Sequence, residues 1–231
     1  MQRLSFLLIY LALSLLEFYS ETRLPGNPTL HYLTKPALLA ALSLYFYRET
    51  RGHRNRRDVL FQIALAFAWL GDVLLMLENG FLAGLGVFLV MQAVYTIVFW
   101  ERPFRPLWQL PARRARVALA LIVVFAVQVF IKISPNLNGL TIPVVVYLLV
   151  ILTMALTAFN RLDQVPQISF RLVAVGAALF VVSDGFIALT RFSGDAGGLS
   201  WLVMPTYAAA QYLIVEGFLR ERVSAPISVP T

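Results

Sequence analysis

The chain lacks cysteine entirely and has few charged residues. None of its 231 residues is Cys, and only 13% are Asp, Glu, Lys or Arg, about half of the usual fraction in soluble proteins. The absence of cysteine excludes disulfide bonds, a thiolate nucleophile and cysteine metal sites. The two histidines, His31 and His53, offer little material for a metal centre, so we do not expect a metal-dependent hydrolase.

Apolar residues are abundant instead. They make up 59% of the chain, and the mean hydropathy is +0.76. Apolar runs long enough to cross a bilayer recur from Leu4 to Leu219. Residues 1–231 are therefore predicted to form a single membrane domain with no separable soluble part. The runs are continuous rather than alternating, which excludes a membrane β-barrel and predicts an all-α fold.

Eight such runs, separated by polar breaks, predict a polytopic membrane protein with eight transmembrane helices. The first run is kept as a helix because the residues after it, 17–21, match a signal-peptide cleavage site poorly. The predicted spans are 4–20, 31–47, 59–77, 80–99, 116–134, 138–159, 170–190 and 201–219. Within the fourth, Gly80 and Gly84 form a small-xxx-small face that favours close helix packing.

Basic residues alternate between crowded and sparse loops along these spans. Fifteen of the nineteen fall on one side, most of them in the loops 48–58 and 100–115. The other side has Arg23, Lys132 and Arg191, and Lys35 lies inside a span. The positive-inside rule then places both termini in the cytoplasm. The net charge of +7 is thus explained by topology rather than by nucleic-acid binding, and the expected location is a bacterial inner (cytoplasmic) membrane.

Two short similarities indicate an internal duplication. Residues 33–36 (LTKP) resemble 140–143 (LTIP), at an offset of 107 residues. Residues 71–77 resemble 183–189 at an offset of 112 residues. Two matches at nearly one offset predict two similar four-helix halves, unless they reflect chance similarity between apolar segments.

The halves would cover approximately residues 1–110 and 111–231. Each would hold an even number of spans, so both would have the same orientation, related by an axis along the membrane normal. Asp72 and Asp184, which occupy equivalent positions in the two repeats, would then face each other.

Lys35, Asp72 and Asp184 are ionisable residues inside predicted spans. An ionised side chain there costs at least about 2.5–3.5 kcal/mol unless it is paired or hydrated. All three fall in the outer half of the bilayer, so they share a depth. They could form a purely structural ion pair. However, two acids against one lysine leave one carboxyl able to hold a proton, because a like charge and a low dielectric favour its neutral form.

Two further acids also lie in predicted spans. Glu17 is nearer its helix end and is expected to be interfacial, whereas Glu216, beside Arg220 and Arg222, is expected to be an ordinary surface acid.

Uncharged polar side chains of similar depth lie in the fourth and eighth spans. Gln92 and Tyr95 share a helix face, as do Tyr207 and Gln211, with Thr206 beside them. Each face could line a polar cavity. The alternative is interhelical hydrogen bonding with no catalytic role.

The motifs around these residues resemble those of the YhhN-like lysoplasmalogenases. The similarity runs from about residue 33 to 214, and it consists of Lys35-Pro36, Trp69-Leu70-Gly71-Asp72, Phe81-x-x-Gly84-Leu85-x-x-Phe88 leading to Tyr95, Ser183-Asp184 with Ala188-Leu189-x-Arg191-Phe192, and Met204-x-Thr206-Tyr207-x-x-x-Gln211. The order and spacing are specific, although each short motif alone is weak.

This resemblance implies an eight-span enzyme that hydrolyses the vinyl ether bond of a lysoplasmalogen to a fatty aldehyde and a glycerophospho-alcohol. It implies a lysophospholipid substrate, the lipid bilayer as surroundings, and neither a metal nor an organic cofactor; it carries no signal for an oligomeric state. One departure stands out. Family members usually carry a histidine where this sequence has Gln92, and an amide can only donate or accept hydrogen bonds.

The resemblance and the two aspartates inside predicted spans together suggest two different catalytic roles, one for each aspartate. Asp72 and Asp184 are the predicted catalytic residues: one protonates the vinyl ether carbon, and the other stabilises the resulting cation or activates water. We favour Asp72 as the acid, although the similarity of the halves leaves the assignment open. The predicted substrate-binding residues are Lys35, Gln92, Tyr95, Ser183, Thr206, Tyr207 and Gln211.

A secondary transporter or lipid carrier is the main alternative, because repeated halves with ionisable residues near the midplane also describe that class. A non-catalytic membrane scaffold is a third. The hydrolase alone releases aldehyde without a gradient. A transporter moves its solute unchanged, and a scaffold is indifferent to Asp72→Asn and Asp184→Asn.

Overall fold

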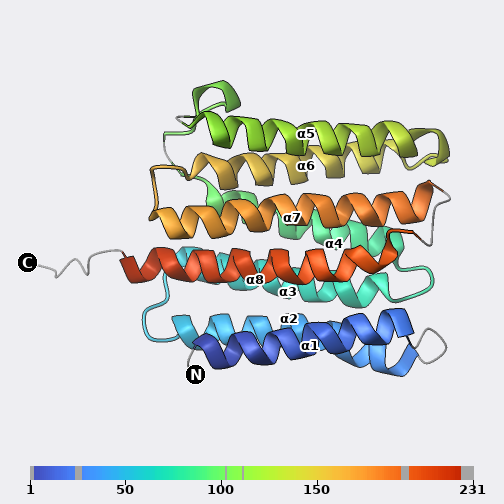
Figure 1. The fold of residues 1–231 in the computed structure, drawn as a ribbon, viewed down its shortest axis with the longest axis horizontal. Helices are drawn as coiled ribbons and strands as arrows, with labels where there is room; N and C mark the ends of the chain where they lie inside the picture. The colour runs from blue at the N-terminus through green and yellow to red at the C-terminus, as the bar shows by residue number, and fades with distance from the viewer. Residues whose placement is uncertain (1–2, 24–27, 102, 111, 194–197, 225–231) are drawn as a thin grey trace, which may run out of the picture.

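Eight long helices run side by side in the computed structural model, which describes residues 3–23, 28–101, 103–110, 112–193 and 198–224 (Figure 1). They are α1 (Arg3–Arg23), α2 (Pro28–Thr50), α3 (Arg56–Leu75), α4 (Phe81–Phe99), α5 (Arg113–Ile133), α6 (Thr141–Asn160), α7 (Gln167–Phe192) and α8 (Ser200–Ser224), with short 3-10 helices η1 (Leu107–Gln109) and η2 (Ser134–Asn136). Strands are absent from the described residues. The predicted all-α fold with eight helices is confirmed.

Seven of the eight helices are long and apolar enough to cross a membrane; the exception is α2. That helix has 23 residues, but it carries His31 and Lys35 among its apolar side chains. Large apolar side chains face outward along the bundle: Leu4, Leu121 and Ile142 are 66%, 64% and 76% exposed. Soluble monomers rarely expose extensive apolar patches. The chain is an integral, multi-pass membrane protein.

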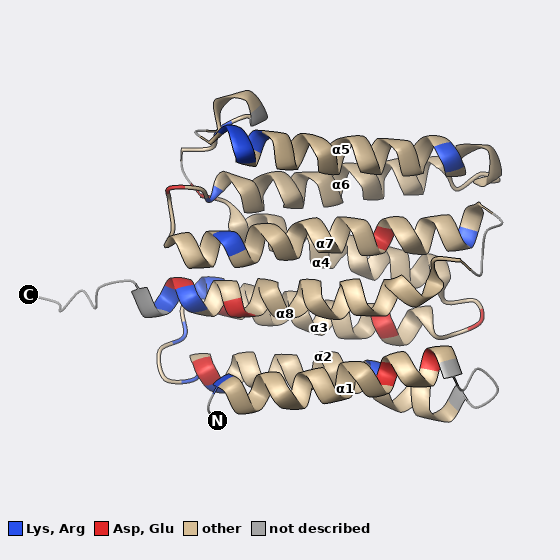
Figure 2. Cartoon of the chain, in the orientation of Figure 1, with Lys and Arg blue, Asp and Glu red and all other residues tan. Residues whose placement is uncertain are grey.

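Basic residues gather at one end of the bundle, where α1 starts and α8 ends (Figure 2). We call this the basic end. Acidic residues inside the helices lie in both halves of the bundle (Figure 2). The charge asymmetry that the sequence predicted is therefore an asymmetry of the folded bundle.

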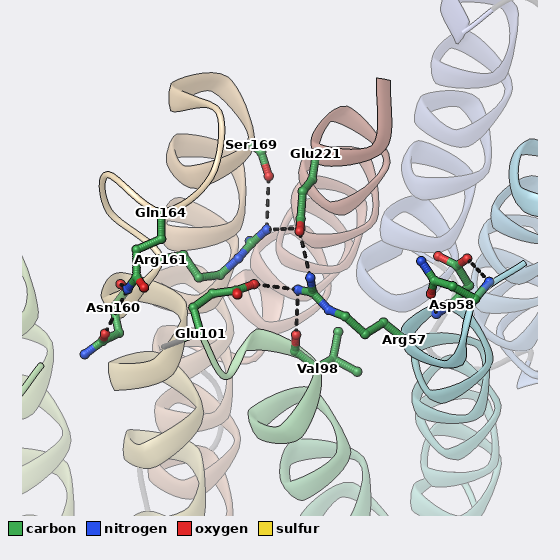
Figure 3. Close-up of polar contacts among 10 residues, drawn as sticks. Arg57, Asp58, Val98, Glu101, Asn160, Arg161, Gln164, Ser169 and Glu221 are labelled. Atoms are coloured by element: carbon green, nitrogen blue, oxygen red, sulfur yellow. Dashed lines mark hydrogen bonds and ion pairs between the residues drawn. The ribbon is translucent and has the colours of Figure 1, made fainter. Parts of the chain in front are cut away.

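A network of partly buried ion pairs connects five helices at the basic end (Figure 3). Arg57 in the first turn of α3 pairs with Glu101, just after α4, and with Glu221 of α8, each at 2.8 Å. Arg161, after α6, is fully buried and bonds both Glu221 (2.5 Å) and Ser169 of α7 (3.1 Å). Burial raises the pKa of Glu101, against the effect of Arg57, and burial lowers the pKa of Arg161, against the effect of Glu221.

Small residues allow the helices that carry the site to approach closely. A Cβ added at Gly84 of α4 would lie 2.7 Å from the Leu75 side chain and 3.4 Å from the Gly71 carbonyl oxygen of α3. Gly84 thus confirms the predicted close packing of the fourth span. On the other side of the bundle, a Cβ at Gly185 of α7 would lie 2.6 Å from the Phe125 ring of α5. A glycine therefore lies beside each of the two aspartates.

Candidate active site

Asp72 lies in the last turn of α3, and its side chain is buried, with 2% of the residue exposed. The Tyr207 hydroxyl of α8 donates a hydrogen bond to its Oδ2 at 3.0 Å. Gly71 makes room for this arrangement, because an added Cβ there would be 2.8 Å from the Phe88 ring. A buried carboxyl is thereby held against a phenol from a distant part of the sequence.

A chain of hydrogen bonds extends from Asp72 toward the interior of the bundle. The Tyr95 hydroxyl of α4 donates to Oε1 of Gln211 at 2.9 Å, and Nε2 of Gln211 donates to the Tyr207 oxygen at 3.4 Å. Tyr95 and Gln211 are fully buried. Every donor in this series of hydrogen bonds points toward Asp72, so the Tyr207 hydroxyl uses its proton for the hydrogen bond to the carboxyl oxygen. Such directed donors stabilise a negative charge on the acceptor.

Charged groups of α1 and α2 lie near the same carboxyl. Lys35, Glu17 and His31 each interact electrostatically with Asp72. Glu17 is fully buried, pairs with His31 Nδ1 at 2.7 Å and accepts a hydrogen bond from Thr34. Glu17 is therefore enclosed by protein and has a structural partner, and its expected position at the membrane interface stays a prediction. No ion pair joins Lys35 to Asp72 or Asp184 among the described residues, so its influence on Asp72 acts across a longer distance.

Asp184 lies on α7, two turns before the end of the helix. The Tyr147 hydroxyl of α6 donates to its Oδ2 at 2.5 Å. Asp184 is only partly buried, unlike Asp72. Tyr147 is the functional candidate that the sequence reasoning missed. Its signal was weak, because a single tyrosine in an apolar run is more often a packing residue than a partner of a distant carboxyl.

Two apolar cavities meet at Asp184. The first, of about 70 Å³, is lined by α3, α4, α6 and α7, with Phe81 and Phe192 at its rim away from the basic end. The second, also about 70 Å³, lies between α5, α6 and α7. Asp184 and Tyr147 line both. Each cavity has room for a few waters or a short piece of alkyl chain, so a lipid would place only its reacting segment there.

Gln92 lies close to this second carboxyl. It is fully buried on α4, next to Tyr147, yet neither side-chain amide atom has a well-formed hydrogen bond. An unpaired buried amide costs about 1–3 kcal/mol. A polar partner supplied from outside the chain, such as water or a substrate hydroxyl, would satisfy it.

Two of the predicted site hydroxyls bond to backbone instead. The Ser183 hydroxyl donates to the Val203 carbonyl of α8 at 3.1 Å. Thr206 donates to carbonyls of its own helix, to Leu202 at 2.6 Å and to Val203 at 3.0 Å. Pro205 lies inside the continuous helix α8 beside them. Ser183 thus joins α7 to α8, and both side chains satisfy carbonyls near the proline.

The two aspartates interact electrostatically but share no hydrogen bond. Asp72 is enclosed and receives a directed chain of donors, whereas Asp184 faces apolar cavities. The two similar acids therefore have different surroundings, and paired acid–base chemistry uses carboxyls whose surroundings differ. Within the described residues, no group of three or more His, Asp or Glu is placed to hold a metal ion.

Known proteins are similar in sequence to this chain over most of its length. The model of the YhhN family matches residues 30–218. Lysoplasmalogenase from Mycobacterium tuberculosis (strain CDC 1551 / Oshkosh) is 29% identical over 216 residues, which cover 91% of this chain and 78% of that protein. Lysoplasmalogenase TMEM86A from Bos taurus is 31% identical over 167 residues, 69% of this chain and 65% of that protein.

Lysoplasmalogenase TMEM86B from Homo sapiens is 27% identical over 190 residues, 81% of this chain and 74% of that protein. No solved structure matches. The segment matched by the family includes both aspartates and all of their hydrogen-bond partners.

Proposed function

Because this chain belongs to the YhhN family, we propose that it is a lysoplasmalogenase-type hydrolase, which cleaves the vinyl ether bond of a lysoplasmalogen with water. The substrate is a 1-alkenyl-glycerophosphoethanolamine or -choline, and the products are a fatty aldehyde and the glycerophospho-alcohol. The relatives that share its sequence are named lysoplasmalogenases. The observation that carries the proposal is a carboxyl, Asp184, at an apolar cavity with a second buried carboxyl nearby.

The reaction begins with protonation of the β-carbon of the vinyl ether. The resulting oxocarbenium ion takes up water at the carbon bonded to oxygen, and the added water loses one proton to a carboxylate, which gives a hemiacetal. The bond from that carbon to the glycerol oxygen then breaks, the glycerol oxygen takes a proton from the carboxyl, and the hemiacetal hydroxyl gives up its own proton as the carbonyl of the aldehyde forms. One protonated and one ionised carboxyl supply the proton and stabilise the cation, as in glycoside hydrolysis.

In this proposal Asp184 is the acid and Asp72 the carboxylate, the reverse of the assignment favoured from sequence. Asp184 lines the cavities and can reach a bound alkenyl chain. Each aspartate accepts one tyrosine hydrogen bond. Asp72 lines neither cavity, however, and it also feels the charge of Lys35, which favours its ionised form. The near symmetry of the sequence repeats hid this difference in surroundings.

The other predicted residues support this pair. Tyr95, Gln211 and Tyr207 orient Asp72, and Gln92 offers its unpaired amide to the attacking water or to the substrate hydroxyl. Tyr147 holds the Asp184 carboxyl toward the cavities. Ser183 holds α7 against α8, and Thr206 bonds carbonyls of its own helix, so neither hydroxyl is assigned to the lipid.

The basic end faces the cytoplasm in this proposal, with both termini on that side of a bacterial inner membrane. Its support is the concentration of arginines at that end of the bundle (Figure 2). The carboxyl pair then lies in the outer half of the bilayer, where the polar head of a lysolipid in the outer leaflet can reach the cavity rim.

Aldehyde release tests the proposed function. Protein purified in detergent is supplied with lysoplasmenylethanolamine, and wild type, Asp72→Asn, Asp184→Asn and the loop control Asp163→Asn are compared. We expect aldehyde from wild type and from the control, and a loss of about 100-fold or more for each site variant. A folded wild type that releases no aldehyde from any lysolipid, but moves the lipid unchanged, would favour the transporter instead.

A further inference from the structure

The last turn of α7 carries an arginine close to the rim of the Asp184 cavity. The Arg191 guanidinium lies 5.1 Å from the centre of the Phe81 ring. Phe81 and Phe192 line the cavity, and their rings meet edge to face at 5.7 Å. Arg191 is exposed, and no carboxylate among the described residues pairs with it. A cation therefore lies over an aromatic residue at the entrance to the site.

We propose that Arg191 binds the phosphate of the lysophospholipid while its vinyl ether reaches Asp184. This inference rests on the proposed function, which it deepens by naming the residue that recognises the head group. A guanidinium suits a phosphate oxygen pair because its donors form a rigid fork. The aromatic face of Phe81 keeps the guanidinium at the rim without neutralising it.

The dimensions of helix and lipid agree. Arg191 follows Asp184 by seven positions, which is two turns and about 10 Å along one face of α7. Helical side chains lean toward the N-terminus of the helix, so the guanidinium extends back toward Asp184. In the lipid, seven bonds separate the β-carbon of the vinyl ether from phosphorus, about 8 Å when extended. One molecule can thus contact both residues.

Lys35 is the basic residue in this half of the bundle that the sequence analysis placed among the substrate-binding residues. It lines neither cavity, and it interacts electrostatically with Asp72 and with Glu21. A phosphate at Lys35 would compete with these carboxyls, whereas no carboxylate in the part of the chain that the structure describes pairs with Arg191. The position of Arg191 at the rim also leaves the head group in water, where a charged ethanolamine or choline is best solvated.

The test compares Arg191→Gln with Arg171→Gln, the same change at the other end of the same helix. Two substrates are used: lysoplasmenylethanolamine and the 1-alkenylglycerol that lacks its phosphate. For the phospholipid, Arg191→Gln should raise KM about 10- to 100-fold and change kcat little. For the phosphate-free lipid, wild type and Arg191→Gln should be equal, and Arg171→Gln should match wild type throughout.

Equal KM values for wild type and Arg191→Gln on the phospholipid would overturn the inference. So would an equal loss on both lipids, because a general effect on the fold does not depend on phosphate.

A binding measurement separates this inference from the proposed function. The saturated 1-alkyl-glycerophosphoethanolamine has no vinyl ether to protonate, and its affinity can be measured whether or not the protein is an enzyme. Arg191→Gln should weaken its binding about 10- to 100-fold but leave 1-alkylglycerol binding unchanged. If wild type releases no aldehyde but this difference is found, only the hydrolase proposal fails; if it is absent, the phosphate site fails.

Discussion

Replacing Glu221 with glutamine should destabilise the protein more than replacing Arg161, the buried arginine that it binds, with methionine. The change leaves the Arg161 guanidinium, which is fully buried, without its carboxylate. Among the described residues, the Ser169 hydroxyl at 3.1 Å is then the one side chain that still accepts a hydrogen bond from it. Removing one partner of a buried pair costs about 3–5 kcal/mol, because the remaining charge stays desolvated. For a chain of this size the loss corresponds to a fall of roughly 10 °C in the unfolding midpoint.

Arg161→Met provides the matched comparison. It removes the buried cation together with its desolvation, and Glu221 keeps its ion pair with Arg57 at 2.8 Å. Thermal unfolding of both variants in one detergent measures the difference. The reasoning predicts that Arg161→Met lowers the midpoint by less than half as much as Glu221→Gln. Equal shifts, or a larger shift for Arg161→Met, would refute it.

Three further predictions concern the candidate site. Tyr147→Phe removes the hydroxyl that holds Asp184. It should lower kcat about 10-fold or more in the aldehyde assay and leave the unfolding midpoint almost unchanged. An unaltered kcat would exclude this role of Tyr147. Gln92→Met removes an unpaired buried amide, so it should raise stability by about 1–3 kcal/mol in thermal unfolding while lowering activity, and a loss of stability would contradict the reasoning. Gly185→Val places a Cβ against a ring of α5 and should reduce the folded yield on size exclusion, whereas the control Gly86→Val has free space and should not.

The helices, and the part of the site around Asp72, were predictable from sequence. The bilayer accepts only satisfied backbone, so long apolar runs with polar breaks determine eight helices almost by themselves. Helix periodicity placed Tyr207 and Gln211 on one face, and the structure joins both to the hydrogen-bond chain that ends at Asp72. The common depth of these residues was enough to suggest that they meet. The two predicted halves, 1–110 and 111–231, stay a prediction.

The remaining features depend on which helices are neighbours, and hydropathy and periodicity in a single sequence do not reveal the neighbours of a helix. Glu216 was expected at the surface, yet it is 4% exposed and bonds Arg3 (3.3 Å) and Tyr45 (3.1 Å) from α1 and α2. Tyr147 meets Asp184 because α6 packs on α7, although 37 residues separate them. Partners supplied by distant helices decide whether a membrane acid is buried, and hydropathy does not encode them.

The position of bond cleavage tests the central claim, that protonation at carbon leads to a hemiacetal. Wild-type protein is incubated with lysoplasmenylethanolamine in water enriched in oxygen-18, and the mass of the released glycerophosphoethanolamine is measured. The account predicts an unlabelled glycerophosphoethanolamine formed together with aldehyde, because water attacks the alkenyl carbon and the glycerol oxygen is retained. Glycerophosphoethanolamine that carries the heavy isotope would show attack at the glycerol carbon and would contradict the mechanism.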